Sequence, residues 1–226
     1  MLTIRFLFER NGRLRFTSHL DMLRTFQRAF RRAGFKVSYS QGFNPHMDMV
    51  LGMPLGVGTT STTEYADVGM DEKIDTDEFV KRLNQALPEG LLAIRAAYKT
   101  NKDNIMASIA QLTCEIMFEG DFQQGELSGA LDRLLAKTEI QIEKTSKNGT
   151  KIVEIRGKIR AAKYIDEKTV ELCCDSGSRS NLSPELFVAA LKTELPKIKY
   201  FSVCRMKILT EKEGKLLDPM SDTALN

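Results

Sequence analysis

The sequence predicts an α+β fold built from two ferredoxin-like halves, each a split β-α-β unit with an antiparallel sheet. β-prone segments such as 2–8 alternate apolar and polar residues, as strands with one buried face do. Two segments, 18–33 and 75–87, instead repeat apolar residues at helical spacing. Over residues 1–99 the elements follow the order β-α-β-β-α-β with an extra hairpin, and residues 108–209 repeat that order loosely.

The first half starts with a strand at 2–8. An Asn-Gly turn signal follows, after which 13–17 is expected to pair back as a short strand. A helix then begins at Ser18 and ends at Gly34, and the spacing Ser18-x-x-Asp21 is that of a capping box with Asp in place of the usual Glu. The remaining expected elements are strands at 35–40, 47–53, 63–70 and 91–99, loops at 41–46 and 54–62, and a helix at 75–87.

The second half follows a polar segment, 100–107, which is expected to be a linker. Two separate domains and one continuous sheet both fit the pattern, and from Thr210 a polar stretch predicts a flexible tail over 210–226. The expected elements are strands at 108–119, 138–144, 151–164, 168–175 and 200–209, helices at 125–136 and 183–194, and a turn at Lys147–Gly149.

The composition is that of an ordinary globular protein, with 42% hydrophobic and 28% charged residues among 226. No apolar run approaches roughly 20 residues, so no contact with a membrane is expected. The N-terminal segment is a poor signal peptide, because Arg5 interrupts it and no small-residue cleavage site follows. The four cysteines lack C-x-x-C spacing, whereas thiolate metal sites need several converging sulfurs. We therefore expect reduced thiols, a cytoplasmic location, no metal and no cofactor.

Charge is distributed unevenly along the chain. Residues 1–46 carry nine basic and two acidic side chains, a net charge of +7. The other residues carry 24 basic and 28 acidic side chains, a net charge of −4. The overall charge of +3 therefore conceals a basic N-terminal segment, which predicts a polyanionic partner.

The helix at 18–33 places a stripe of arginines opposite an apolar face on which Leu20, Leu23 and Phe30 are expected. The planar guanidinium fork suits phosphate oxygens, so the stripe predicts contact with a nucleic-acid backbone. The alternative is a solvated helix face in which Asp21 pairs with an arginine. The predicted phosphate-binding residues are Arg24, Arg28, Arg31 and Arg32, joined by Arg13 and Arg15.

Both histidines of the chain stand in H-x-D sequences of the first half. His19 precedes Asp21 at the helix start, and His46 precedes Asp48 after an Asn-Pro turn. In a shared cleft, His19, His46 and Asp21 would be candidates for general acid–base catalysis. The two histidines and the two carboxylates, Asp21 and Asp48, could alternatively bind one divalent metal. The alternative is that His19 and Asp21 cap the helix and His46 hydrogen-bonds a loop.

The loop before His46 is rich in hydroxyls, amides and aromatics. Tyr39 is a candidate for stacking on bases, whereas Phe43 is expected to be buried beside a glycine with positive φ. The Gly-rich segment 54–61 is not a phosphate-binding P-loop, since no G-K-[ST] follows. The predicted pocket residues are Ser18, Tyr39, Asn44, Ser61 and Glu64.

Three motifs follow one another in the first half: F-T-S-H-L-D-x-x-R, then Y-S-x-G-F-N-P-H, then P-L-x-x-G-x-x-S-x-x-E-x-x-D. Their order and spacing over residues 4–67 resemble a bacterial radical-SAM-associated family of unknown function, whose members stand alone or form the C-terminal part of cobalamin-binding radical-SAM proteins. The family pattern usually continues N-P-H with Pro and Lys, where this chain has Met47 and Asp48. The resemblance implies association with radical-SAM chemistry on RNA, although the three-cysteine cluster motif is absent from this chain.

These observations together predict an accessory module, without catalysis of its own, that recognises RNA or phosphate for an RNA-modifying radical-SAM partner. One alternative is a stand-alone enzyme that uses His19, His46 and Asp21 on a phosphorylated or nucleic-acid substrate. A further alternative is a protein-interaction scaffold with a basic docking face.

Overall fold

The computed structural model describes residues 2–146 and 149–224, and the chain divides into two compact units. Unit 1 comprises Met1–Ile109 and Ile208–Asn226, and unit 2 comprises Ala110–Lys207. Each unit combines helices with an antiparallel sheet, which confirms the predicted α+β class.

Unit 1 has the strand order of a ferredoxin-like unit. Strands β4, β1, β3 and β2 lie side by side in that order, and each neighbouring pair is antiparallel. Helix α1 connects β1 to β2 and α2 connects β3 to β4, which makes a split β-α-β unit. The elements are β1 (Leu2–Arg10), the 3-10 helix η1 (Gly12–Phe16), α1 (His19–Arg32), β2 (Met49–Leu51), β3 (Thr60–Met70), α2 (Thr76–Ala86), β4 (Leu91–Lys99), α3 (Ile105–Ser108), β11 (Lys215–Leu217), η3 (Pro219–Asp222) and β12 (Thr223–Ala224).

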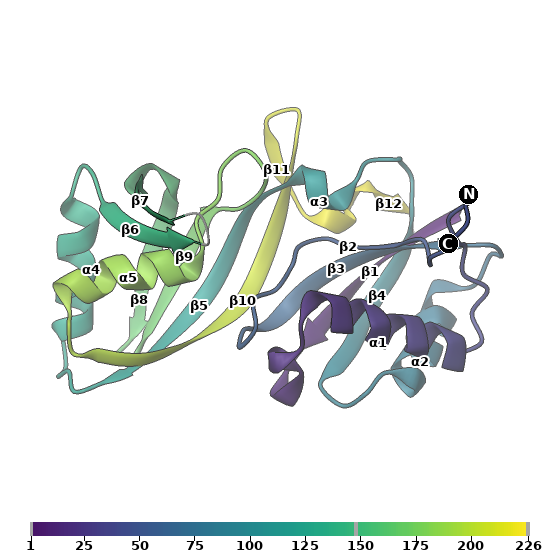
Figure 1. Ribbon diagram of the computed structural model, residues 1–226, viewed down its shortest axis with the longest axis horizontal. Helices are drawn as coiled ribbons and strands as arrows, with labels where there is room; N and C mark the ends of the chain where they lie inside the picture. Colours follow the sequence, from purple (N-terminus) through teal and green to yellow (C-terminus); the bar gives the residue numbers. More distant parts are fainter. Residues whose placement is uncertain (1, 147–148, 225–226) are drawn as a thin grey trace. The chain divides into compact units, whose positions relative to one another are not determined.

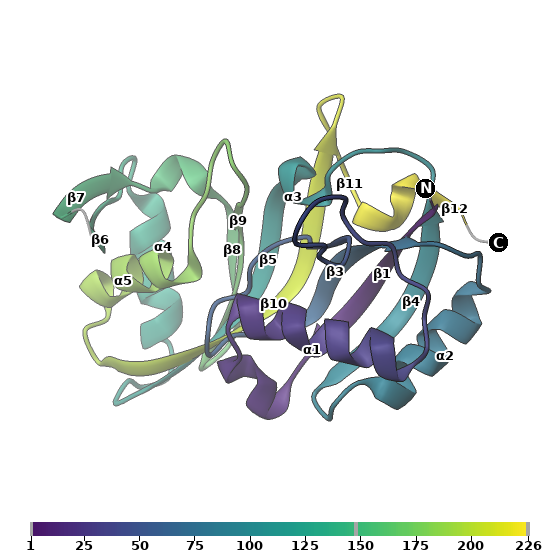
Figure 2. The same cartoon turned by 45° about the vertical axis from the view of Figure 1, so that its right-hand side comes forward.

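The main core of unit 1 lies between the sheet and the two long helices, which cover one face of it (Figures 1 and 2). Alternate residues of β1, including Phe6 and Phe8, point to this face and are buried. The ring of Phe26 on α1 meets Phe6 and Phe8 edge to face, with centroid distances of 5.5 and 4.9 Å. These contacts fix which side of α1 is buried.

The opposite face of the sheet holds a second core that includes the C-terminal segment. Ile105 of α3 and Met220 of η3 are buried there against Tyr65. Strand β12 also pairs with β4, and Arg5 donates a hydrogen bond to the carbonyl oxygen of Pro219 at 2.6 Å. The described part of 210–226 therefore carries regular structure where the sequence favoured a flexible tail. The reason is long-range burial of an apolar residue within a polar stretch.

Unit 2 repeats the same strand order. Strands β10, β5, β9 and β8 lie side by side in the sheet in that order. Helix α4 follows β5 as α1 follows β1. A β6–β7 hairpin is inserted between α4 and β8. The elements are β5 (Ile109–Gly120), α4 (Glu126–Ala136), β6 (Gln141–Ser146), β7 (Gly149–Glu154), η2 (Arg156–Lys158), β8 (Ile159–Asp166), β9 (Thr169–Asp175), α5 (Pro184–Glu194) and β10 (Ile198–Lys212), whose last five residues belong to unit 1.

Four local predictions differ from the structure. Within the linker expected at 100–107, helix α3 begins at Ile105, whose side chain is buried. The expected strand at 13–17 is the 3-10 helix η1, which Gly12 enters with a φ of 59°. The expected strand at 35–40 forms isolated bridges of Val37 and Tyr39 instead of a ladder. The expected strand at 151–164 is split into β7 and β8 by η2. The turn expected at Lys147–Gly149 lies largely outside the described residues.

Candidate nucleic-acid interface

Helix α1 begins where the sequence predicts, and Ser18 and Asp21 determine its start. The Ser18 Oγ accepts a hydrogen bond from the Asp21 backbone N–H at 3.2 Å, which satisfies a donor that has no partner within the helix. The same hydroxyl donates to the Asp21 carboxylate at 2.7 Å. The hydrogen bonds from Ser18 and, second, from Arg24 hold the pKa of Asp21 below its usual value. Both predicted site residues therefore serve the helix start.

One face of α1 is buried and the opposite face carries arginines. Met22, Phe26, Ala29 and Phe30 are buried. At 100° per residue, the three arginines of the other face lie within about 60° of one another around the helix axis. These three are Arg24, Arg28 and Arg31, all exposed. The predicted stripe is thus present, although Leu20, expected on the buried face, is 62% exposed on the arginine side.

The arginines of α1 differ in their partners. Arg24 pairs with Asp21 at 3.1 Å, and both side chains are more than half exposed, so the pair is weak. Arg32 donates to the carbonyl oxygen of Ala86 at the end of α2, at 2.5 Å. Within residues 2–146 and 149–224, the guanidinium groups of Arg28 and Arg31 make no hydrogen bond or ion pair. They are therefore the α1 cations most available to a ligand.

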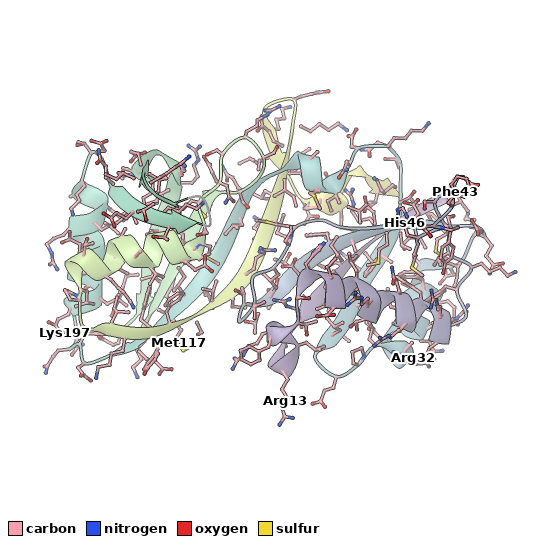
Figure 3. The ribbon with its side chains drawn as sticks, in the orientation of Figure 1. Arg13, Arg32, Phe43, His46, Met117 and Lys197 are labelled. Atoms are coloured by element: carbon pink, nitrogen blue, oxygen red, sulfur yellow. The ribbon has the colours of Figure 1, made fainter. Side chains whose placement is uncertain are left out.

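Two further arginines extend this surface from η1. Arg13 and Arg15 are exposed, and the Arg15 guanidinium lies 4.9 Å from the centroid of the Phe16 ring. Figure 3 shows Arg13 projecting from the ribbon at the end of the unit opposite Arg32. We call Arg13, Arg15, Arg24, Arg28 and Arg31 the basic face.

Two other N-terminal arginines are structural. Arg5 donates twice to the Asp67 carboxylate, at 2.7 and 2.9 Å, and Lys99 donates to the same carboxylate at 2.9 Å. All three side chains are less than 10% exposed. Arg10 is 2% exposed and donates to backbone carbonyl oxygens of loop 56–59 at 2.8 and 2.9 Å. Part of the N-terminal positive charge therefore stabilises the fold and is closed to a ligand.

A small cavity lies beside the first residue of α1. Its volume of about 20 Å³ is close to that of one water-sized probe, so it does not hold a substrate. The predicted pocket residue Ser61 is fully buried, and its Oγ accepts a hydrogen bond from the Thr63 N–H at 3.1 Å. The cavity is lined by Phe8, Arg10, His19, Met22, Leu55 and Glu64.

His46 belongs to a loop closed by Ser40. The Ser40 N–H donates to the His46 carbonyl oxygen at 2.8 Å, and the His46 N–H donates to the Ser40 Oγ at 3.0 Å. The same hydroxyl lies 2.8 Å from the His46 Nδ1. Gly42, with a φ of 136°, turns the loop, and Phe43 is fully exposed rather than buried as predicted. Tyr39 and Asn44 are exposed in this same segment.

The structure does not bring the two histidines together. His19 lines the cavity with Glu64 of β3. Near His46, the carbonyl oxygen of Asp48 accepts a hydrogen bond from the Gly69 N–H, toward the other end of β3. Glu64 and Gly69 are separated by about 16 Å of strand at 3.3 Å per residue. No shared cleft for acid–base chemistry forms between His19 and His46.

Two observations concern metal ligands and thiols in the described residues. None of their His, Cys, Asp and Glu side chains gather in threes that could hold a metal ion. Burial raises the pKa of Cys114 to about 12 and raises that of Cys174 as well, so both thiols stay protonated. Across the same residues, every helix is too short or too polar to cross a membrane.

Comparison with known proteins identifies a family. A family model described as "Uncharacterized protein conserved in bacteria (DUF2344)" matches residues 3–184. The chain belongs to this family. The match covers η1, α1 and loop 41–46 of unit 1 and most of unit 2. No curated protein matches the sequence.

Two solved structures show distant similarity to this DUF2344 member. A chain in "Crystal Structure of a Cbf5-Nop10-Gar1 Complex" is 8% identical, with a TM-score of 0.46 over 94% of this chain and 50% of that chain. The protein studied here thus spans half the length of that chain. The small subunit of acetolactate synthase from Thermotoga maritima is 7% identical, with a TM-score of 0.27 over 94% of this chain and 99% of that one. Both scores are under 0.5, so no argument rests on either likeness.

Exposed apolar residues that were not among the predicted site residues lie beside the basic face. Phe16, Leu20 and Val57 are 61%, 62% and 66% exposed. For Leu20 a signal was available, because 100° per residue places it 40° from Arg24 and 20° from Arg31 around the helix. For Phe16 and Val57 the exposure depends on how η1 and loop 54–59 fold, which no local pattern indicates.

Proposed function

We propose that this DUF2344 protein is a non-catalytic module that binds RNA through the basic face of unit 1, on behalf of a radical-SAM enzyme that modifies the RNA in the cytoplasm. The radical-SAM partner is inferred from the motif resemblance. RNA binding is inferred from the surface of α1 and η1.

The observation that supports the proposal is that several guanidinium groups of the basic face have no protein partner among the described residues. The side chains of Arg13, Arg28 and Arg31 are exposed, and their guanidinium groups make no hydrogen bond or ion pair with any described residue. Asp21 is the acidic residue of α1, and it already accepts hydrogen bonds from Ser18 and Arg24. Arg24, Arg28 and Arg31 span about 10 Å along the helix axis, at 1.5 Å per residue, and exposed guanidinium groups at this spacing suit the phosphates of a nucleic-acid backbone.

The test is a salt titration of RNA binding by the variant R13Q/R28Q/R31Q. Because each phosphate contact releases counterions, we expect at least about tenfold weaker binding at low salt. The log–log salt slope should flatten by about 2, at about 0.7 per single-strand contact. Fluorescence anisotropy with a labelled single-stranded RNA measures both quantities.

The matched control is K73Q/K81Q/K102Q, which removes the same charge from exposed positions of the same unit. It should bind RNA within about twofold of wild type, since these lysines lie outside the basic face. Equal weakening by both variants would show that only net charge matters and would refute the assignment to α1 and η1. Thermal unfolding of both variants should match wild type, because exposed substitutions shift stability by no more than about 0.5 kcal/mol each.

A further inference from the structure

We infer that the exposed apolar cluster beside the basic face, Phe16, Leu20 and Val57, stacks an unpaired base, so that the RNA recognised is single-stranded or looped rather than duplex. This inference rests on the proposed function and narrows its substrate class.

The three residues of the apolar cluster come from adjoining segments. Phe16 ends η1 and Leu20 is the second residue of α1, so only the three residues of the helix start separate them. Val57 lies in loop 54–59, which is held beside η1 because the Gly58 N–H donates to the Arg15 carbonyl oxygen at 2.7 Å. The buried Arg10 holds the same loop through its carbonyl oxygens. These hydrogen bonds hold the backbone that carries Val57 beside the backbone that carries Phe16.

Arginines lie beside Phe16 and Leu20, where they could bind the backbone of a single strand whose base stacks on the apolar cluster. The Arg15 guanidinium lies on the Phe16 ring, and Leu20 continues the line of Arg24 and Arg31 along the exposed side of α1. Proteins that bind single strands combine a basic track for the backbone with aromatic rings on which bases stack. In duplex RNA the bases are stacked within the helix and the major groove is too deep and narrow to admit side chains. An aromatic ring at the end of a basic track therefore favours an unpaired base.

Scattered apolar residues on a surface are ordinary and need no explanation. The apolar cluster differs because its three members are each more than 60% exposed and border one arginine line. Phe43 offers a contrast within the same unit. It is even more exposed, but it sits on the loop closed by Ser40, toward the end of β3 away from His19.

The experiment compares one RNA sequence as a single strand and as a duplex, with 2-aminopurine placed at successive positions of the single strand. In the variant F16A/L20A, binding of the single strand should fall on the order of tenfold. The salt slope should be unchanged, because no phosphate contact is lost. Duplex affinity should also stay unchanged, and the quenching of 2-aminopurine by the wild-type protein should be lost. The variant F16Y keeps a ring at the same position and should keep both the affinity and the quenching.

The control F43A should bind both RNAs as wild type does. If F16A/L20A binds the single strand as tightly as wild type while R13Q/R28Q/R31Q binds weakly, the stacking inference is wrong and the proposed function stands. If the wild-type protein binds neither RNA, the proposed function fails and the stacking inference fails with it. If the wild-type protein is a dimer and F16A/L20A is a monomer with unchanged RNA affinity, the apolar cluster is a self-association surface. That outcome refutes the inference.

Discussion

Helices α1 and α4 occupy the same position in two units of the same topology, yet their surfaces differ. Each follows the first strand of its unit and covers the sheet. On α1, the guanidinium groups of Arg28 and Arg31 form no ion pair with any described residue. On α4, Arg133 pairs with Glu194 of α5 at 3.2 Å. The two units therefore share a topology but differ in how their surface charges are paired, and the proposed polyanion site follows from that pairing rather than from the fold.

Unit 2 neutralises its helix with charges from neighbouring segments. Lys197 pairs with Glu126 of α4 at 2.7 Å, and Lys137 pairs with Glu194 at 2.6 Å. In these pairs the lysines are nearly half exposed and Glu194 is 15% exposed, so water screens the attraction in part. The pairs do reduce the positive potential that a phosphate would sense. On the exposed side of α1, such pairing is limited, among the described residues, to Arg24 with Asp21.

The largest expected effect is on the free energy of unfolding. Each unit carries one buried carboxylate on the third strand of its sheet, Asp67 in unit 1 and Asp175 in unit 2. Asp67 of β3 is buried with Arg5 and Lys99, so Asp67→Asn leaves two buried cations without their counter-charge. We expect a loss of about 3 kcal/mol in the free energy of unfolding. Asp175→Asn in β9 should cost only about 1 kcal/mol, because its partner Arg160 is 49% exposed and hydrated. Urea denaturation measures both values, and a larger loss for Asp175→Asn would contradict the comparison.

A smaller effect is expected at the start of α1. Ser18→Ala removes the N-cap hydrogen bond and should cost about 1 kcal/mol. It should also raise the pKa of Asp21, since the Ser18 hydroxyl is the main group that lowers it. Because the pKa of Asp21 is lower in the folded state, its ionised carboxylate stabilises the fold at pH values above the unfolded pKa of about 3.9. This stabilisation is lost as the pH falls through the folded pKa. NMR titration of the carboxyl resonance measures the shift, and an unchanged pKa would show that Arg24 alone sets it.

The smallest expected effect is a gain in RNA affinity when ion pairs of unit 2 are removed. The variant E126Q/E194Q releases Arg133, Lys137 and Lys197 from their ion pairs. We expect RNA affinity to rise by about twofold at low salt, because freed cations at the surface attract phosphate. Anisotropy at two salt concentrations measures the change. A fall in affinity would mean that these carboxylates take part in binding.

Local patterns predicted the elements well, and long-range contacts account for the misses. The start of α1 at Ser18 was predictable because an N-cap acts within three residues. The arginine stripe followed from helical periodicity alone. The hydrogen-bond partners of individual arginines could not be predicted, because Arg10 and Arg32 donate to carbonyl oxygens about 50 residues away in the sequence. The burial of Met220 depends in the same way on a distant part of unit 1.

The most direct test of the account is to map where RNA touches the protein. Single-stranded RNA containing 4-thiouridine would be photo-crosslinked to the full chain, and the attached peptides identified by mass spectrometry. The account predicts crosslinks in residues 11–32 and in loop 54–59, and none in α4. Crosslinks concentrated on α4 or elsewhere in unit 2 would contradict it, because they would show that the unpaired arginines of α1 do not guide the RNA.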